Sequence, residues 1–289
     1  MSEHLVEAKD ATIQFGGLRA VDGVNMYIDE GEIVAMIGPN GAGKTTFFNL
    51  LTGIYKPTEG DILFEGRSVS SVKPDKIAEW GISRTFQNIR LFKSMTALEN
   101  VMIGRHIRMK GNAWGASFHT PGFKREEYEA QRYAEECLDF CDLLPFANEI
   151  SSSLPYGAQR RLEIARALAT EPKLICLDEP AAGMNTTESA HLNELIFGLR
   201  DRGVTVLLIE HDMKVVMNLA ERIYVLDFGK LIAQGNPAEI QNNPLVIEAY
   251  LGKGAEAIAH EHKGTGPAAP DAADEVPSEV PASDETKEA

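Results

Sequence analysis

The sequence predicts an α/β layer fold, in which the strands of a parallel sheet alternate with helices. The evidence is a series of apolar runs without polar alternation, which is typical of strands buried on both faces, with helical patterns between them. The runs are residues 173–177, 204–209 and 222–227, and the helical patterns between them are residues 187–200 and 214–220. A further apolar run at 32–37 is followed by a glycine-rich turn and a helical pattern at 44–53, which ends at a glycine.

The glycine-rich turn carries the pattern G-x-x-x-x-G-K-[ST], which is the P-loop. Its residues are Gly38, Pro39, Asn40, Gly41, Ala42, Gly43, Lys44 and Thr45, and Thr46 follows. Small residues let successive backbone N–H groups curl around a polyphosphate, which would lie at the N-terminus of the following helix, where the helix dipole favours an anion. We expect Lys44 to reach the β- and γ-phosphates, and the Thr45 hydroxyl to ligate Mg²⁺. The loop therefore predicts binding of a nucleoside triphosphate.

The other segments are predicted in chain order around this loop. Residues 5–28 indicate antiparallel strands with turns, and a strand is expected at 61–64. A short helix at 74–79 and a strand at 81–87 follow. Residues from about 89 to 160 change to a helical pattern, which we interpret as a helical subdomain inserted into the α/β core. Its expected elements are helices at 96–108 and 125–144, a loop at 110–123 and, at its end, a helix at 160–169.

Composition limits the classes of protein that fit. An apolar content of 44% in 289 residues supports a globular core, and a formal net charge of −15 argues against a nucleic-acid-binding surface. We expect a cytoplasmic protein for three reasons. The three cysteines lack metal-ligand spacing, the sequence has no long apolar run, and its start lacks a signal-peptide pattern. Residues 253–289 have no aromatic residue, nine alanines, four prolines and a net charge of −6. They predict a disordered acidic tail after one domain of residues 1–252.

Four further residues add chemistry to the P-loop. The apolar run at 173–177 ends in Asp178 and Glu179, so that Asp178 can hold Mg²⁺ and Glu179 can polarise an attacking water as a general base. Gln87 ends a predicted strand, and His211 follows the predicted strand at 204–209. A neutral histidine at this place could contact the γ-phosphate and orient the water beside Glu179. Together these residues predict hydrolysis of a nucleoside triphosphate that is bound with Mg²⁺.

Taken in chain order, the motifs of this sequence resemble those of the ATP-binding subunits of ABC transporters, and the resemblance extends over residues 5–252. The resemblance includes the P-loop, the Q-loop at Gln87, the strand that ends at Asp178-Glu179 and the switch histidine His211. The signature of the family corresponds to Leu154, Pro155, Tyr156 and Gly157, before Ala158 and Gln159. Stretches such as ISRTFQNIRLF, LDEPAAGMN and VIEAYLG are similar to the subfamily for uptake of branched-chain amino acids.

The resemblance implies an assembly with several partners. Two ATP-binding subunits would sandwich two ATP molecules, each between one P-loop and the signature of the other subunit. The second subunit would be a different chain, two membrane permeases would dock near residues 87–92, and a solute-binding protein would deliver the cargo. The protein would lie at the cytoplasmic face of the cell membrane. The resemblance also implies that Phe15 stacks on adenine and that Thr45, Asp178 and Gln87 hold Mg²⁺.

The signature departs from the usual L-S-G-G-Q. Pro155 replaces a serine and so lacks both its hydroxyl and a backbone N–H, from which we hypothesise a weaker grip on the facing nucleotide. We interpret the two residues that follow Gln159, Arg160 and Arg161, as a solvated helix start. Two other functions stay open. One is an ATPase for another ABC transporter, such as a lipopolysaccharide exporter, and the other is a soluble ABC ATPase, which the single cassette and acidic charge disfavour.

Overall fold

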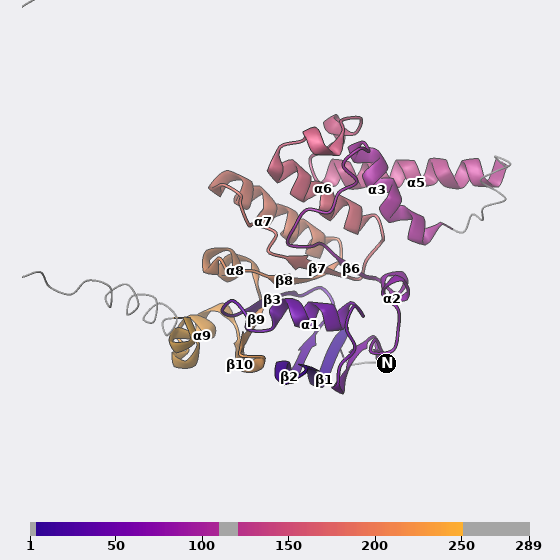
Figure 1. The fold of residues 1–289 in the computed structure, drawn as a ribbon. Coiled ribbons are helices and arrows are strands. Elements are labelled where there is room, and N and C mark those ends of the chain that lie inside the picture. The colour runs from indigo at the N-terminus through magenta and orange to yellow at the C-terminus, as the bar shows by residue number, and fades with distance from the viewer. Residues whose placement is uncertain (1–3, 110–120, 251–289) are drawn as a thin grey trace, which may run out of the picture. The chain divides into compact units, whose positions relative to one another are not determined.

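The main sheet of the structure is six-stranded, with the order β10-β9-β3-β8-β7-β6. The computed structural model describes residues 4–109 and 121–250 of the chain (Figure 1). Its main strands are β3 (Ile33–Ile37), β6 (Ile82–Arg84), β7 (Leu174–Asp178), β8 (Thr205–Ile209), β9 (Arg222–Asp227) and β10 (Lys230–Gly235). All neighbours in the sheet are parallel except β9 and β10. This sheet confirms the predicted α/β fold, and it places the ends of β3 and β7 at the same edge.

Two hydrophobic cores lie on the two faces of this sheet. Along β3, the side chains of Ile33, Ala35 and Ile37 belong to one core, and those of Val34 and Met36 belong to the other. Every residue of β3, β7 and β8 is buried. Burial on both faces explains why these strands read as continuous apolar runs in the sequence.

A second, antiparallel sheet forms the predicted N-terminal β layer. Its order is β2-β1-β4-β5, and its strands are β1 (Val6–Phe15), β2 (Leu18–Ile28), β4 (Glu59–Phe64) and β5 (Arg67–Ser68). Helix α1 (Lys44–Leu51) contributes Phe47 and Phe48 to the core that this sheet shares with the main sheet. Figure 1 shows the helix between the two sheets. The P-loop helix is therefore held between the two sheets.

The remaining helices pack mainly on the other face of the main sheet. The α-helices are α2 (Pro74–Trp80), α3 (Ala97–Arg105), α5 (Pro121–Phe140), α6 (Tyr156–Leu168), α7 (Thr186–Asp201), α8 (Met213–Leu219) and α9 (Pro237–Gln241). Short 3₁₀ turns are His106–Arg108, Leu144–Phe146 and Ser151–Ser153. Helices α3, α5 and α6 pack against one another and lie together in Figure 1. None of the helices within the described ranges is long and apolar enough to cross a membrane.

The boundaries of helix α5 differ from the sequence prediction. The helix begins at Pro121, so the last three residues of the predicted loop at 110–123 are helical, because proline is well suited to the first turn of a helix. The helix ends at Phe140, and Asp142 adopts a left-handed backbone with φ of 55°. The rest of the predicted loop and the predicted tail at 253–289 lie outside the described residues.

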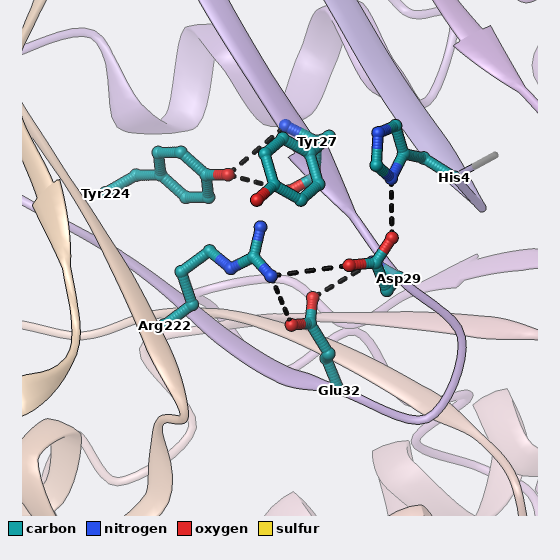
Figure 2. Close-up of polar contacts among 6 residues, drawn as sticks. All are labelled: His4, Tyr27, Asp29, Glu32, Arg222 and Tyr224. Carbon is teal, nitrogen blue, oxygen red and sulfur yellow. Dashed lines mark hydrogen bonds and ion pairs between the residues drawn. The ribbon is translucent and has the colours of Figure 1, made fainter.

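A polar cluster joins the N-terminal layer to the main sheet. Figure 2 shows its members, His4, Tyr27, Asp29, Glu32, Arg222 and Tyr224. The Arg222 guanidinium donates to Glu32 at 2.6 Å and to Asp29 at 3.3 Å, and it lies 4.0 Å from the centre of the Tyr27 ring. The Tyr224 hydroxyl donates to the backbone oxygen of Tyr27 at 2.8 Å. Since Glu32 directly precedes β3, the cluster fixes the strand that leads into the P-loop.

Candidate nucleotide-binding site

A cavity of about 520 Å³ opens beside the P-loop. Its lining contains many residues that the sequence analysis singled out, namely Phe15, Asn40, Gly41, Ala42, Gly43, Lys44, Thr45, Thr46, Gln87 and Glu179. Five further lining residues were not singled out, and they are Leu18, Arg19, Ala20, Phe228 and Gly229. Segments from both sheets and from the strand end at β7 therefore converge on one hollow.

The P-loop backbone fits this place only with glycine at two positions. Gly38 has φ of 146°, and a Cβ there would lie 2.0 Å from the backbone oxygen of Leu226. Gly43 has φ of 103°, and a Cβ there would lie 2.3 Å from the backbone oxygen of Ala20. Gly43 is also the N-cap of α1, and no side chain of the described residues caps that helix. The N–H groups at the start of α1 therefore suit an anion such as a phosphate.

The Lys44 side chain is held against the loop. It is buried, and its ammonium group donates to the backbone oxygens of Gly38 at 2.7 Å and Pro39 at 3.0 Å. Thr45 is exposed and lines the cavity. A cation that bridges the two ends of the loop is placed to neutralise phosphate charge in the hollow.

Asp178 lies at the end of β7 with its side chain only 2% exposed. One carboxylate oxygen, Oδ2, accepts a hydrogen bond from Arg84 at 2.9 Å. The other, Oδ1, is buried without a hydrogen-bond partner within residues 4–109 and 121–250. Burial raises the pKa of Asp178, and Arg84 opposes this shift. A buried carboxylate oxygen without a donor fits a divalent cation, since hard cations take oxygen ligands.

Glu179 follows in a left-handed backbone conformation, with φ of 48°. Such strain in a non-glycine residue costs about 1–3 kcal/mol and is frequent at functional sites. The Glu179 Oε2 atom accepts a hydrogen bond from Gln87 Nε2 at 2.9 Å and lies 3.7 Å from His211 Nδ1. The structure thus brings together three residues that are far apart in the sequence, around a carboxylate that faces the cavity.

Glu210 is a member of this region that the sequence analysis missed. Its side chain is 1% exposed and accepts hydrogen bonds from the backbone N–H groups of Ala181 at 2.8 Å and His211 at 3.2 Å. Burial raises the pKa of Glu210. The carboxylate ties the loop after Glu179 to the loop of His211, and its sequence signal was an acid placed directly after the apolar strand β8.

The signature residues lie apart from the cavity. Within the described part of the chain, the residues that line the cavity do not include Leu154, Pro155, Tyr156 or Gly157. Pro155 is the N-cap of α6, and within the described chain no side chain caps this helix. The Tyr156 side chain is 45% exposed, and Gly157 is buried against Glu188 of α7. Two separate helix N-termini, those of α1 and α6, are therefore presented by one chain.

Arg160 is buried, contrary to its interpretation as part of a solvated helix start. Its side chain is 5% exposed, and its guanidinium donates to the backbone oxygens of Phe86 at 2.8 Å and of Gln87. It also lies 3.4 Å from the buried carboxylate of Glu163. The interpretation was wrong because the Q-loop folds over α6 and supplies carbonyl acceptors. Arg160 therefore connects Gln87 to the helix that follows the signature.

Together these features define a P-loop nucleotide-binding site at one edge of an α/β sheet. The sequence profile described as "ABC transporter" matches residues 21–182, and that described as "Branched-chain amino acid ATP-binding cassette transporter" matches residues 230–256. The chain therefore belongs to the ABC transporter family, as one of its ATP-binding and ATP-hydrolysing subunits. This membership confirms the resemblance found in the sequence motifs.

Curated relatives match over their whole length. The chain is 50% identical over 254 residues to the high-affinity branched-chain amino acid transport ATP-binding protein BraF of Pseudomonas aeruginosa, a match that covers 88% of this chain and 100% of that protein. It is 48% identical over 254 residues to the protein of the same description, LivG, of Escherichia coli strain K12, with the same coverage. The similarity therefore includes every segment of these proteins.

Solved structures show the same fold. The ADP conformation of MJ1267, an ATP-binding cassette of an ABC transporter, is similar with a TM-score of 0.76 and 32% identity, over 87% of this chain and 100% of that chain. The dimeric structure of MJ0796, a bacterial ABC transporter cassette, is similar with a TM-score of 0.68 and 29% identity, over 80% of this chain and 98% of that chain. Relatives of this fold have thus been seen with a bound nucleotide and as dimers.

Proposed function

We propose that this protein powers an importer of branched-chain amino acids from the cytoplasmic face of the cell membrane. The observation that carries the proposal is the full-length match to two transport ATP-binding proteins for branched-chain amino acids, at 50% and 48% identity. The separate match of residues 230–256 to a branched-chain amino acid profile supports it, because this segment covers β10 and α9 rather than the P-loop.

We assign the phosphate-binding role from the geometry of the cavity, and the metal-binding role from two residues that line it and from Asp178, which directly precedes the lining residue Glu179. The P-loop amides and Lys44 hold the phosphates, and Thr45, Asp178 and Gln87 hold Mg²⁺. When bound, the metal supplies positive charge that neutralises the phosphates and orients them. Two observations support this assignment: the buried Oδ1 atom of Asp178 has no hydrogen-bond partner among the described residues, and Thr45 is an exposed residue that lines the cavity.

The hydrolytic role belongs to Glu179 in this proposal. Its carboxylate takes a proton from the attacking water, and His211, 3.7 Å from that carboxylate, orients the same water. We assign Phe15 to stack on the adenine ring. This aromatic residue lines the cavity and is 45% exposed, so its ring is accessible to a base. Tyr55 supports Phe15 edge-on, with the ring centres 5.3 Å apart.

A second ATP-binding subunit completes the site. The signature lies outside the cavity of its own chain, so its helix N-terminus is available to a nucleotide held by another subunit. The dimeric cassette among the similar structures supports this arrangement. We propose that the partner is a different chain of the same family.

The permeases dock at a groove beside the Q-loop. A hollow of about 430 Å³ lies between α2, β6, α3 and α6, and its lining includes Phe86, Phe92 and Ile103. The Phe92 side chain is 46% exposed. A cytoplasmic helix of a permease would place apolar side chains in this groove, next to the segment that ends at Gln87.

Reconstitution in lipid vesicles tests this function. The chain is to be purified with the two permeases and the partner cassette that accompany it, and the solute-binding protein is to be supplied inside the vesicles. We expect leucine, isoleucine or valine to stimulate ATP hydrolysis and to be transported, and Lys44→Ala to abolish both. Stimulation only by another solute, or export of a lipid, would overturn the proposal, as would a failure to co-purify with membrane proteins.

The proline in the signature leads to a further prediction. Pro155→Ser is expected to raise ATP hydrolysis in the assembled complex by about 10- to 150-fold, because one charge-assisted hydrogen bond to the facing phosphate is worth about 1.5–3 kcal/mol. The serine also caps α6, which stabilises the protein by about 1 kcal/mol. Pro155→Ala is the matched control, since it removes the ring without supplying a hydroxyl. Equal rates of ATP hydrolysis in Pro155→Ser and Pro155→Ala would show that the missing serine hydroxyl does not limit hydrolysis.

A further inference from the structure

Arg84 occupies a buried position between the P-loop helix and the end of β7. Its side chain is 6% exposed, and its Nη2 atom donates to Asp178 Oδ2 at 2.9 Å. Its Nη1 atom donates to Asn49 Oδ1 at 2.6 Å, and the Thr52 hydroxyl lies 3.5 Å away. Because Asn49 belongs to α1 and Thr52 caps its end, one guanidinium joins Asp178 to the helix that begins with Lys44.

Two aromatic rings lie close to this guanidinium. Its central carbon is 5.3 Å from the centre of the Phe48 ring and 5.0 Å from that of Phe86. Phe48 is fully buried on α1, and Phe86 directly precedes Gln87. Packing on both rings and two hydrogen-bonded arms leave the guanidinium little rotational freedom.

The arrangement divides the two carboxylate oxygens of Asp178 between different partners. Arg84 occupies Oδ2, whereas Oδ1 has no hydrogen-bond donor anywhere in the described part of the chain. Without Arg84, the buried Asp178 carboxylate would lose its hydrogen-bonded partner of opposite charge, and nothing described would fix its rotation about the Cβ–Cγ bond. Arg84 therefore determines which oxygen is available as a ligand.

We propose that Arg84 is a positioning residue for Mg²⁺, which holds Asp178 by Oδ2 so that Oδ1 is presented to the metal. The inference rests on the proposed function of Asp178 as a metal ligand. It also connects the metal to the Q-loop, because Arg84 ends strand β6 and lies three residues before Gln87. A change in the position of the Q-loop strand would thus reach the metal ligand through one side chain.

The test compares ATP binding with and without the metal. The affinity for ATP is measured by calorimetry in Mg²⁺ and in EDTA for the parent protein and for Arg84→Met, which keeps the side-chain length but removes the charge and donors. We expect the gain in ATP affinity caused by Mg²⁺ to fall by about 10-fold or more, as is typical when the residue that orients a metal ligand is lost. The affinity in EDTA is expected to change less than about threefold, because Arg84 does not line the nucleotide cavity.

Two further variants separate positioning from a general loss of structure. Arg90→Met is the matched control, since Arg90 also lies over the Phe86 ring, at 4.2 Å, but its side chain is exposed. It is expected to keep the parental effect of Mg²⁺. Arg84→Lys restores the charge with a single arm and is expected to recover part of the metal effect. If Arg84→Met does not fold, Arg84→Lys is compared with the parent protein by the ratio of its ATP affinities in Mg²⁺ and in EDTA. A smaller ratio than the parental one supports the inference, and an equal ratio overturns it.

A spectroscopic measurement and a double variant complete the test. With Mn²⁺ in place of Mg²⁺, the EPR spectrum of the bound metal and ATP is expected to change in Arg84→Met but not in Arg90→Met. Adding Arg84→Met to Asp178→Asn should cause little further loss of the metal effect, since Arg84 acts through Asp178. A parental metal effect in Arg84→Met would overturn the inference alone. A parent protein that does not bind ATP would instead overturn the proposed function.

Discussion

Glu179→Gln is expected to lower the rate of ATP hydrolysis by about 10²–10⁴-fold, the usual contribution of a general base. Glutamine has the same shape as glutamate, and its side-chain oxygen can still accept the hydrogen bond that Gln87 donates to Glu179 at 2.9 Å. The side-chain amide of glutamine, however, cannot take a proton from water. ATP is therefore expected to bind with an affinity within about threefold of the parent, a difference of less than 1 kcal/mol. Steady-state hydrolysis and retention of labelled ATP measure the two effects.

Controls for Glu179→Gln separate chemistry from binding. Lys44→Ala is expected to lose both ATP retention and hydrolysis, because the cation that faces the phosphates is removed. Glu194→Gln makes the same chemical change at an exposed position of α7 and should leave both unchanged. Hydrolysis by Glu179→Gln within about tenfold of the parental rate would show that another group activates the water.

The parts of this site that are contiguous in the chain were predictable from the sequence. Gly38 to Thr45 has a conformation that its own residue types dictate, with glycine at the two positions where the backbone meets Leu226 and Ala20. The acids that end β7 were predictable because a strand buried on both faces has a continuous apolar pattern, which makes its end visible. The α/β fold was predictable for the same reason.

The contacts that arrange the site were not predictable, because they depend on packing between distant segments. Arg84 reaches Asp178 only because β6 pairs with β7 in a register that places Arg84 beside Cys176. No local pattern of residues reports that register. Arg160 was misread since a charged residue at a helix start is usually solvated, whereas here the Q-loop covers it. Glu210 was missed for a similar reason, as its partners are backbone N–H groups of another loop.

Gly43→Ala is expected to lower the affinity for ATP by about 100-fold or more, which corresponds to about 2.7 kcal/mol. A φ of 103° already strains any residue with a Cβ, and this Cβ would lie 2.3 Å from the backbone oxygen of Ala20. Ala20 is within β2, so it has little room to move, and the P-loop has to shift instead. The shift displaces the N–H groups that surround the phosphates. Calorimetric titration with ATP measures the loss.

The matched control for Gly43→Ala is Gly203→Ala, because the two glycines differ in what surrounds them. Gly203 has φ of 81°, also in the left-handed region, but a Cβ there would meet no atom within 4 Å among the described residues. It lies between α7 and β8, away from the cavity lining. Gly203→Ala should therefore lose about 1–2 kcal/mol of folding stability and retain parental affinity for ATP. Equal ATP affinities for both variants would show that the close approach of Gly43 to Ala20 is not what shapes the phosphate-binding loop.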